Sequence, residues 1–181
     1  MPRLTRHYAN WPAGVPHTLE ISAANLFTHL QETAGRLPGK PAVVFYGRST
    51  SFGELHRSAL ALAGCMQQRL GVRRGDRVLL MTQNCPQFFV AFYAVMRCDA
   101  VVVALSPMST REEMAYYAAD SGARVLIATQ DMAERAEALL AAGELDACVI
   151  GAPGEMAGNP QEVPWLENTT TRTRRLSMPA P

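Results

Sequence analysis

The chain has 181 residues, of which 48% are hydrophobic and 18% are charged. This share of apolar side chains can form a real core, and it excludes a chain that is disordered throughout. The formal net charge is only +1. No overall electrostatic field therefore attracts nucleic acid or an anionic membrane surface, and we expect no nucleic-acid partner.

The spacing of the cysteines and the composition of the N-terminal residues predict the cellular compartment of the protein. Cys65, Cys85, Cys98 and Cys148 form no C-x-x-C pair and have no histidine at metal-ligand spacing, so we expect small buried residues in a reducing environment. Residues 1–16 lack the apolar segment of a signal peptide. No run approaches the length of about 18 apolar residues that a membrane span needs. These features predict a cytoplasmic protein.

The first third of the chain predicts an arm, a helix and a hairpin. Residues 1–20 have no hydrophobic period, so we expect an extended arm whose Tyr8 and Trp11 pack on the body. A helix is expected over 25–37 with Asn25 as its N-cap, and strands over 42–46 and 49–51.

A long helix should follow the hairpin. Ser51 and Glu54 form an S-x-x-E capping box at its start, and Gly71 ends it. Thr110 and Glu113 form a second capping box further along the chain. Both motifs fix where a helix begins, because the side chains satisfy amide groups that have no partner inside the helix.

Strands and helices alternate from residue 76 onward. The expected elements are a strand at 77–81, a helix at 86–97, a strand at 100–105, a helix at 110–121, a strand at 124–128, a helix at 131–142 and a strand at 147–150. The continuous apolar run at 100–105 is typical of a buried parallel strand, and the helix at 86–97 is apolar nearly all round. The alternation predicts the α/β class, with a mostly parallel sheet flanked by helices.

Composition divides the chain into three parts. The arm covers residues 1–20, and the α/β domain is expected over 21–150. Residues 151–181 are rich in proline and poor in large apolar side chains, so we expect a low-complexity, disordered tail. The arginine run at 172–175 is interpreted as part of a solvated tail in preference to an RNA or membrane contact.

The turns after the strands, where an open α/β sheet binds ligands, carry no phosphate motif. The turns at 82–86 and 106–110 contain no glycine, which argues against a dinucleotide-binding domain. Asn84 is either a ligand contact or, as we favour, an N-cap before Pro86. Cys85 is either a reactive thiol at a helix N-terminus or a buried structural cysteine, and the second is the more common case.

Short phrases in a fixed order resemble the AMP-forming adenylating enzymes. The arm phrase at 7–16 (HYANWPAGVP) resembles that of bacterial long-chain fatty acyl-CoA ligases. The further phrases are GKPA at 39–42, SFGEL at 51–55, GVRRGDRV at 71–78, QNCPQF at 83–88, AVVV at 100–103 and DSGA at 120–123. The resemblance runs from about residue 7 to about residue 150 and identifies the chain as the N-terminal segment of an AMP-forming acyl-CoA synthetase.

The resemblance implies a fold and a reaction. The chain would be part of the large N-terminal domain of enzymes that join a fatty acid to ATP, forming an acyl-adenylate, and then transfer the acyl group to CoA. It implies ATP, Mg²⁺ and CoA for the full-length family. Fatty acid, ATP and CoA would then be the partners of the full-length enzyme.

The departures from the family concern its chemistry. This sequence has no Ser/Thr/Gly-rich phosphate loop ending in Pro-Lys-Gly, and Lys40 stands in a loop phrase and is not the family's catalytic lysine. We therefore carry over no catalytic, cofactor-binding or metal-binding residue and expect no cofactor in this fragment. Arg135, near a point where some relatives contact the CoA nucleotide, is interpreted as an ordinary surface arginine.

Three functional hypotheses follow. The chain is a ligase fragment that is inactive alone, or a non-catalytic interaction or homo-oligomerisation module, or one half of a split ligase completed by a downstream fragment. The apolar helix at 86–97 motivates the second hypothesis. The abrupt change of composition after Trp165 suggests a truncated or shifted reading frame.

Overall fold

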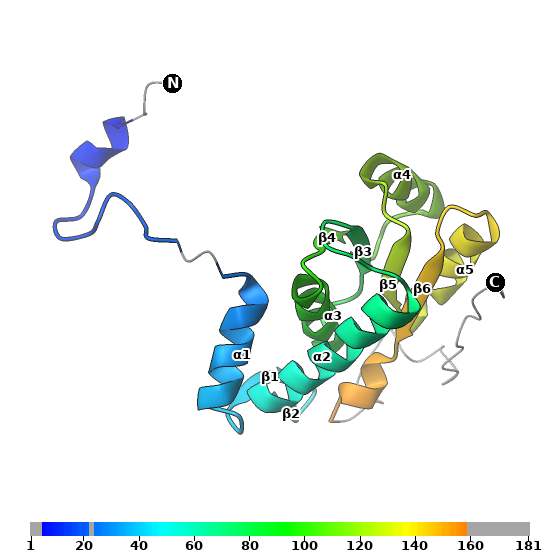
Figure 1. Ribbon diagram of the computed structural model, residues 1–181, viewed down its shortest axis with the longest axis horizontal. Helices are drawn as coiled ribbons and strands as arrows, with labels where there is room; N and C mark the ends of the chain where they lie inside the picture. Colours follow the sequence, from blue (N-terminus) through cyan, green and yellow to red (C-terminus); the bar gives the residue numbers. More distant parts are fainter. Residues whose placement is uncertain (1–4, 22–23, 159–181) are drawn as a thin grey trace.

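The computed structural model describes residues 5–21 and 24–158, and Figure 1 shows how they are arranged. The elements in chain order are the 3₁₀ helix η1 (Arg6–Asn10), α1 (Leu26–Arg36), β1 (Pro41–Phe45), β2 (Arg48–Ser51), α2 (Phe52–Arg69), β3 (Arg77–Met81), α3 (Pro86–Arg97), β4 (Val101–Ala104), α4 (Arg111–Ser121), β5 (Val125–Thr129), η2 (Gln130–Met132), α5 (Ala133–Ala141), β6 (Ala147–Gly151) and η3 (Pro153–Met156). The expected order is confirmed, with boundaries shifted by a residue or two.

The arm differs from the expectation that its aromatic rings pack on the body. It contains η1, and Figure 1 shows it reaching away from the rest of the chain. Tyr8 stacks on His17 with ring centroids 4.1 Å apart, and Trp11 meets the same histidine edge-on at 5.6 Å. The rings therefore cover one another locally, which takes part of their apolar surface from water without help from the domain.

The helix starts follow the caps that the sequence contains. The Asn25 side chain accepts a hydrogen bond from the Thr28 amide, and the Ser51–Glu54 and Thr110–Glu113 capping boxes are both complete. Between α1 and α2 the hairpin β1–β2 turns through Tyr46 and Gly47, which both have positive φ. Two positive φ values match the right-handed twist of a two-residue hairpin turn.

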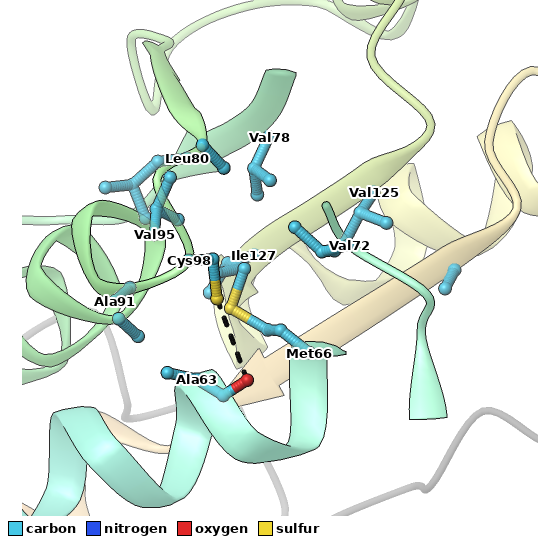
Figure 2. Packing of buried hydrophobic residues seen from close by; sticks show 13 residues of the cluster. Ala63, Met66, Val72, Val78, Leu80, Ala91, Val95, Cys98, Val125 and Ile127 are labelled. Atoms are coloured by element: carbon cyan, nitrogen blue, oxygen red, sulfur yellow. Dashed lines mark hydrogen bonds between the residues drawn. The ribbon is translucent and has the colours of Figure 1, made fainter. Parts of the chain in front are cut away.

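The central sheet has four parallel strands in the order β4-β3-β5-β6. Side chains alternate between its faces: Val78 and Leu80 pack with α2 and α3, whereas Leu79 and Met81 pack with α4 and α5. Figure 2 shows the first of these clusters, in which the Cys98 thiol donates to the Ala63 carbonyl oxygen at 3.7 Å. The α/β class with a parallel sheet flanked by helices is confirmed.

Two elements test the predictions about burial. Helix α3 contacts α1, α2, β1, β3, β4 and η3, which confirms that it packs on more than one side. The prediction of a buried strand at 100–105 is only partly right. β4 is parallel, but it lies at the end of the sheet, and Val101 and Ala104 are exposed. The apolar composition of a strand does not show whether the strand has a neighbour on both sides or lies at the edge of the sheet.

Folded structure continues past residue 150, where we had placed the domain boundary. β6 ends at Gly151 and η3 follows, so the structure remains regular to Met156. Arg48 donates to the Glu155 carbonyl oxygen at 2.6 Å, and the Gly158 amide donates to the Phe45 carbonyl oxygen at 3.4 Å. These bonds attach the segment to the hairpin. Residues 159–181, including the arginine run, lie outside the described residues.

Candidate functional site

The carboxyl ends of the strands lie at one edge of the sheet, and the connections diverge there between β3 and β5. From β3 the chain passes through α3 to β4 on one side, and from β5 it passes through α5 to β6 on the other. Open α/β sheets bind ligands in the crevice outside such a switch point. The segments 82–85 and 130–131 occupy this edge, so we treat it as the candidate site.

Two threonines end the neighbouring strands at this edge. Met81 pairs with Ala128. Extending this register by one residue places Thr82, which directly follows β3, opposite Thr129, the last residue of β5. The alternation of side chains then directs both threonines toward the face that packs on α3. Thr82 is 7% exposed and Thr129 is fully buried. Neither hydroxyl has a hydrogen-bond partner within the described residues, although buried hydroxyls nearly always have one.

Gln87 reaches the same edge from the first turn of α3. Its Nε2 donates to the Ala152 carbonyl oxygen at 2.8 Å, which connects α3 to the end of β6. Its Cγ lies 3.3 Å from the place where a Cβ of Gly151 would stand, and Gly151 pairs with Thr129. A larger residue at Gly151 would displace the Gln87 stem. The Oε1 of Gln87 is buried without a partner among the described residues.

Cys85 is the N-cap of α3, and its thiol is buried. Burial raises the pKa of the Cys85 thiol, and the negative charge of Asp131 adds to the rise. Hydrogen bonds from the Phe88 and Gln87 amides act in the opposite direction but do not outweigh burial. The thiolate is therefore disfavoured, and of our two interpretations the structure supports the buried structural cysteine.

Asn84 is not the N-cap that we favoured. Pro86 occupies the first helical position, so the N-cap is Cys85, and Asn84 lies exposed one residue earlier. Asn84 lines a largely apolar hollow between β1 and the start of α3. The other lining residues are Val43, Val44, Phe45, Cys85, Phe88 and Phe89. The side chain is thus available to a ligand or a neighbouring segment, and it satisfies no helix amide.

Arg135 is half-buried and bound, and the interpretation as an ordinary surface arginine is wrong in this respect. Its Nη1 donates to the carbonyl oxygens of Pro107, at 3.2 Å, and Ser109. Both carbonyls belong to the segment that follows β4 at the carboxyl edge. Arg135 therefore holds that segment against α5, and a guanidinium bound in this way has fewer donors left for a phosphate.

The opposite, amino edge of the sheet has a second hollow, and its charged lining residues are Asp76, Arg77, Arg124 and Asp146. Arg77 Nε donates to the Ser121 carbonyl oxygen at 2.6 Å, and its Nη2 donates to that of Gly122 at 3.1 Å. Arg124 pairs with Asp146 through both carboxylate oxygens, and this pairing lowers the pKa of Asp146. Arg77 thus binds carbonyl oxygens at the end of α4, and Arg124 binds a carboxylate. Both arginines hold connecting segments of the sheet together.

Among the described residues, the candidate site contains hydroxyl and amide groups that can form hydrogen bonds, but no arrangement of side chains that could carry out a reaction. The turns after β3 and β4 contain no glycine, and Lys40 lies exposed in the turn before β1. These residues do not form the glycine-rich backbone cradle that a triphosphate needs. In the described part of the chain no three His, Cys, Asp or Glu side chains gather as metal ligands. That the chain contains no catalytic or cofactor-binding residue stays a prediction.

Sequence reasoning missed the residues that meet at this edge, Thr82, Gln87, Thr129 and Asp131. A local indication existed, because Thr82 and Thr129 each follow a run of buried apolar residues directly. A polar residue at that position marks a strand end. That two such ends are neighbours depends on the strand order, which a single sequence does not show.

Comparison with known proteins establishes the family. The sequence matches the family of AMP-binding enzymes over residues 30–176, which is most of the chain, and the chain belongs to that family. In the part of the chain that the structure describes, no helix is long and apolar enough to cross a membrane.

The curated relatives that the chain resembles include long-chain-fatty-acid–CoA ligases. That of Bacillus subtilis is 35% identical over 113 residues, which are 62% of this chain and 20% of the relative. That of Salmonella typhimurium is 36% identical over 120 residues, 66% of this chain and 21% of the relative. The chain therefore spans about a fifth of the length of the relatives it matches.

Solved structures of CoA ligases share the fold. An anthranilate CoA ligase in complex with anthranoyl-AMP superposes with a TM-score of 0.66 at 23% identity, over 71% of this chain and 25% of that one. The N-terminal domain of FACL13 from Mycobacterium tuberculosis superposes with a TM-score of 0.65 at 24% identity, over 71% of this chain and 34% of that domain. The expected match to N-terminal domains of adenylate-forming enzymes is confirmed.

Proposed function

We propose that the chain supplies the first part of a ligase that activates a long-chain fatty acid with ATP and transfers it to CoA. The observation that carries this proposal is the identity of 35–36% to two long-chain-fatty-acid–CoA ligases. Fatty acid, ATP with Mg²⁺, and CoA would be the ligands of the complete enzyme. A cytoplasmic location belongs to the same proposal, because ATP and CoA are cytoplasmic metabolites.

The chain alone is inactive in this proposal. Phosphoryl and adenylyl transfer depend on groups that stabilise the charge of the phosphates, and these supply most of the rate. The βα turns of this sheet carry no glycine-rich loop for that purpose, and the family's Pro-Lys-Gly phrase is absent from the sequence. The remaining groups would come from a longer product of the same gene or from a downstream ligase fragment.

The proposal is tested by fatty-acid-dependent exchange of radioactive pyrophosphate into ATP. The purified chain at micromolar concentration should give no exchange above a no-protein control. The same assay with the Salmonella typhimurium ligase provides the positive control. Exchange above background by the purified chain would contradict inactivity.

An interaction or oligomerisation module is the alternative, and one observation favours it. Val44, Phe89 and Val101 are 67%, 41% and 48% exposed, although they lie on the hairpin, on α3 and on β4. Val44 and Phe89 line the same hollow, and contiguous exposed apolar surface often marks a contact with another chain or domain. Light scattering distinguishes the cases: self-association at micromolar concentration supports the module, whereas a monomer at all concentrations argues against it.

A further inference from the structure

Four buried polar atoms at the carboxyl edge have no partner in the described part of the chain. They are Thr82 Oγ1, Gln87 Oε1, Thr129 Oγ1 and Asp131 Oδ1. Buried polar atoms in folded proteins are nearly always bonded to protein or to ordered water, and each exception calls for an explanation. The fifth such atom, His56 Nε2, belongs to α2 and lies away from these strand ends.

Three of these atoms belong to residues that the strand register places near one another. Extending the β3–β5 register by one residue sets Thr82 opposite Thr129, with both side chains directed to the face that α3 covers. Gln87 approaches that pair from α3, because its stem rests on Gly151, the register partner of Thr129. Asp131 follows β5 at the same edge, and its charge is near enough to raise the pKa of the Cys85 thiol.

We propose that a buried water molecule bridges Thr82, Thr129 and Gln87. The Gln87 oxygen can only accept a hydrogen bond, whereas each threonine hydroxyl can donate one and accept others. An occupant must therefore donate to Gln87 while it accepts from a threonine. Water does both, and buried waters typically make about three hydrogen bonds of this kind to otherwise unpartnered groups.

The water would connect elements that are far apart in the sequence. It joins the end of β3, the end of β5 and the first turn of α3, and Gln87 continues the connection to Ala152 at the end of β6. Three parallel strands and a helix would then share one hydrogen-bonded junction. This junction keeps the carboxyl edge in register and independent of any ligand.

Removing a threonine hydroxyl tests the proposal. A hydroxyl that bonds to a buried water stabilises the fold, whereas a buried hydroxyl without a partner destabilises it, so its removal changes stability in opposite directions in the two cases. Thr129→Val keeps the shape of the side chain and removes only its hydrogen-bonding group. If the hydroxyl bonds to a water, the substitution leaves that water short of a partner, and the folding equilibrium constant should fall by about fivefold or more. If the hydroxyl truly has no partner, the substitution should leave stability unchanged or raise it, which would overturn the proposal.

A double-mutant cycle in urea unfolding sharpens the test. Thr82→Val should also destabilise, and the double variant should lose less than the two single losses combined, since both hydroxyls bind the same water. Strict additivity would contradict a shared water. Thr50→Val is the matched control, because Thr50 is a buried strand threonine in the hairpin, away from this edge.

A direct observation keeps the proposal falsifiable if Thr129→Val fails to fold. Thr129→Ser retains the hydroxyl and should remain folded. A high-resolution crystal structure of the chain should show an ordered water within hydrogen-bonding distance of Thr82 Oγ1 and Thr129 Oγ1. Density that is empty there, or hydroxyls that bond to the main chain, would overturn the proposal.

Discussion

Cys148 shows how burial in the sheet controls the chemistry of a single side chain. Burial, with a smaller contribution from the charge of Glu137, raises the pKa of its thiol to about 12. Burial also raises the pKa of Cys85 and Cys98. All four cysteines are free thiols in this structure. The expectation that they are buried holds for Cys85 and Cys98, whereas Cys65 and Cys148 are only half-buried.

The raised pKa values predict slow thiol labelling in the native chain. At pH 8 an alkylating reagent should modify Cys85 and Cys98 only at the rate at which the chain unfolds, because their thiolates are scarce and covered. Cys148 is half-buried, so only its raised pKa slows its reaction. Mass spectrometry of the labelled peptides measures this directly, and denatured chain is the control in which all four react. Fast native labelling of Cys85 or Cys98 would contradict the burial of these thiols.

The Arg124–Asp146 pair predicts a pH dependence of stability. The hydrogen bond to Arg124 lowers the pKa of Asp146 in the folded chain below its ordinary value of 3.8. A lowered folded pKa contributes stability that is present above the unfolded value and is lost as pH falls through the folded one. The stability difference between the native sequence and Asp146→Asn should therefore shrink as pH drops below 3.8. Urea unfolding at a series of pH values measures it, and a constant difference would contradict the pairing.

At the level of elements, the end of α4 combines a turn with a cation. Gly122 has φ of 67°, and a Cβ there would stand 2.6 Å from Nη2 of Arg77. That nitrogen donates to the Gly122 carbonyl oxygen, so displacing the guanidinium breaks bonds that hold the end of α4 to β3. The glycine serves both the left-handed backbone and the close approach of Arg77.

We predict that Gly122→Ala destabilises the chain by about 1–2 kcal/mol, from left-handed strain and loss of the Arg77 contact. Gly143→Ala is the matched control, because Gly143 has φ of 71° and nothing within 4 Å of its Cβ position. The Gly143→Ala variant should lose only the part of the stability that comes from left-handed backbone strain. Chemical unfolding of both variants gives the comparison, and equal losses would show that Arg77 moves aside without cost.

Short sequence motifs, above all the helix caps, were enough to predict most boundaries of the helices and strands. Asn25, Ser51 and Thr110 cap their helices through bonds within three residues, so the sequence alone predicts them. The exposure of β4 could not be predicted, because it depends on the absence of a further strand neighbour among the described residues. The site was missed for the same reason: the strand order, which a single sequence does not show, is what makes Thr82 and Thr129 the ends of neighbouring strands.

At the scale of the whole molecule, the resemblance and the fold lead to one account. The parallel sheet, the family match over residues 30–176 and the shared fold of the CoA ligases describe part of an AMP-binding enzyme. The described carboxyl edge provides hydrogen-bonding groups but no phosphate cradle. That the chemistry of the family depends on residues outside this chain stays part of the proposed function.

The most direct test of this account is the nucleotide sequence that follows codon 181, translated in all three forward frames. The account predicts that one frame soon encodes a Ser/Thr/Gly-rich phrase ending in Pro-Lys-Gly, the phosphate loop that completes an acyl-CoA ligase. If no frame encodes such a phrase, the chain is a free-standing domain, and the proposal that it supplies the first part of a ligase is contradicted.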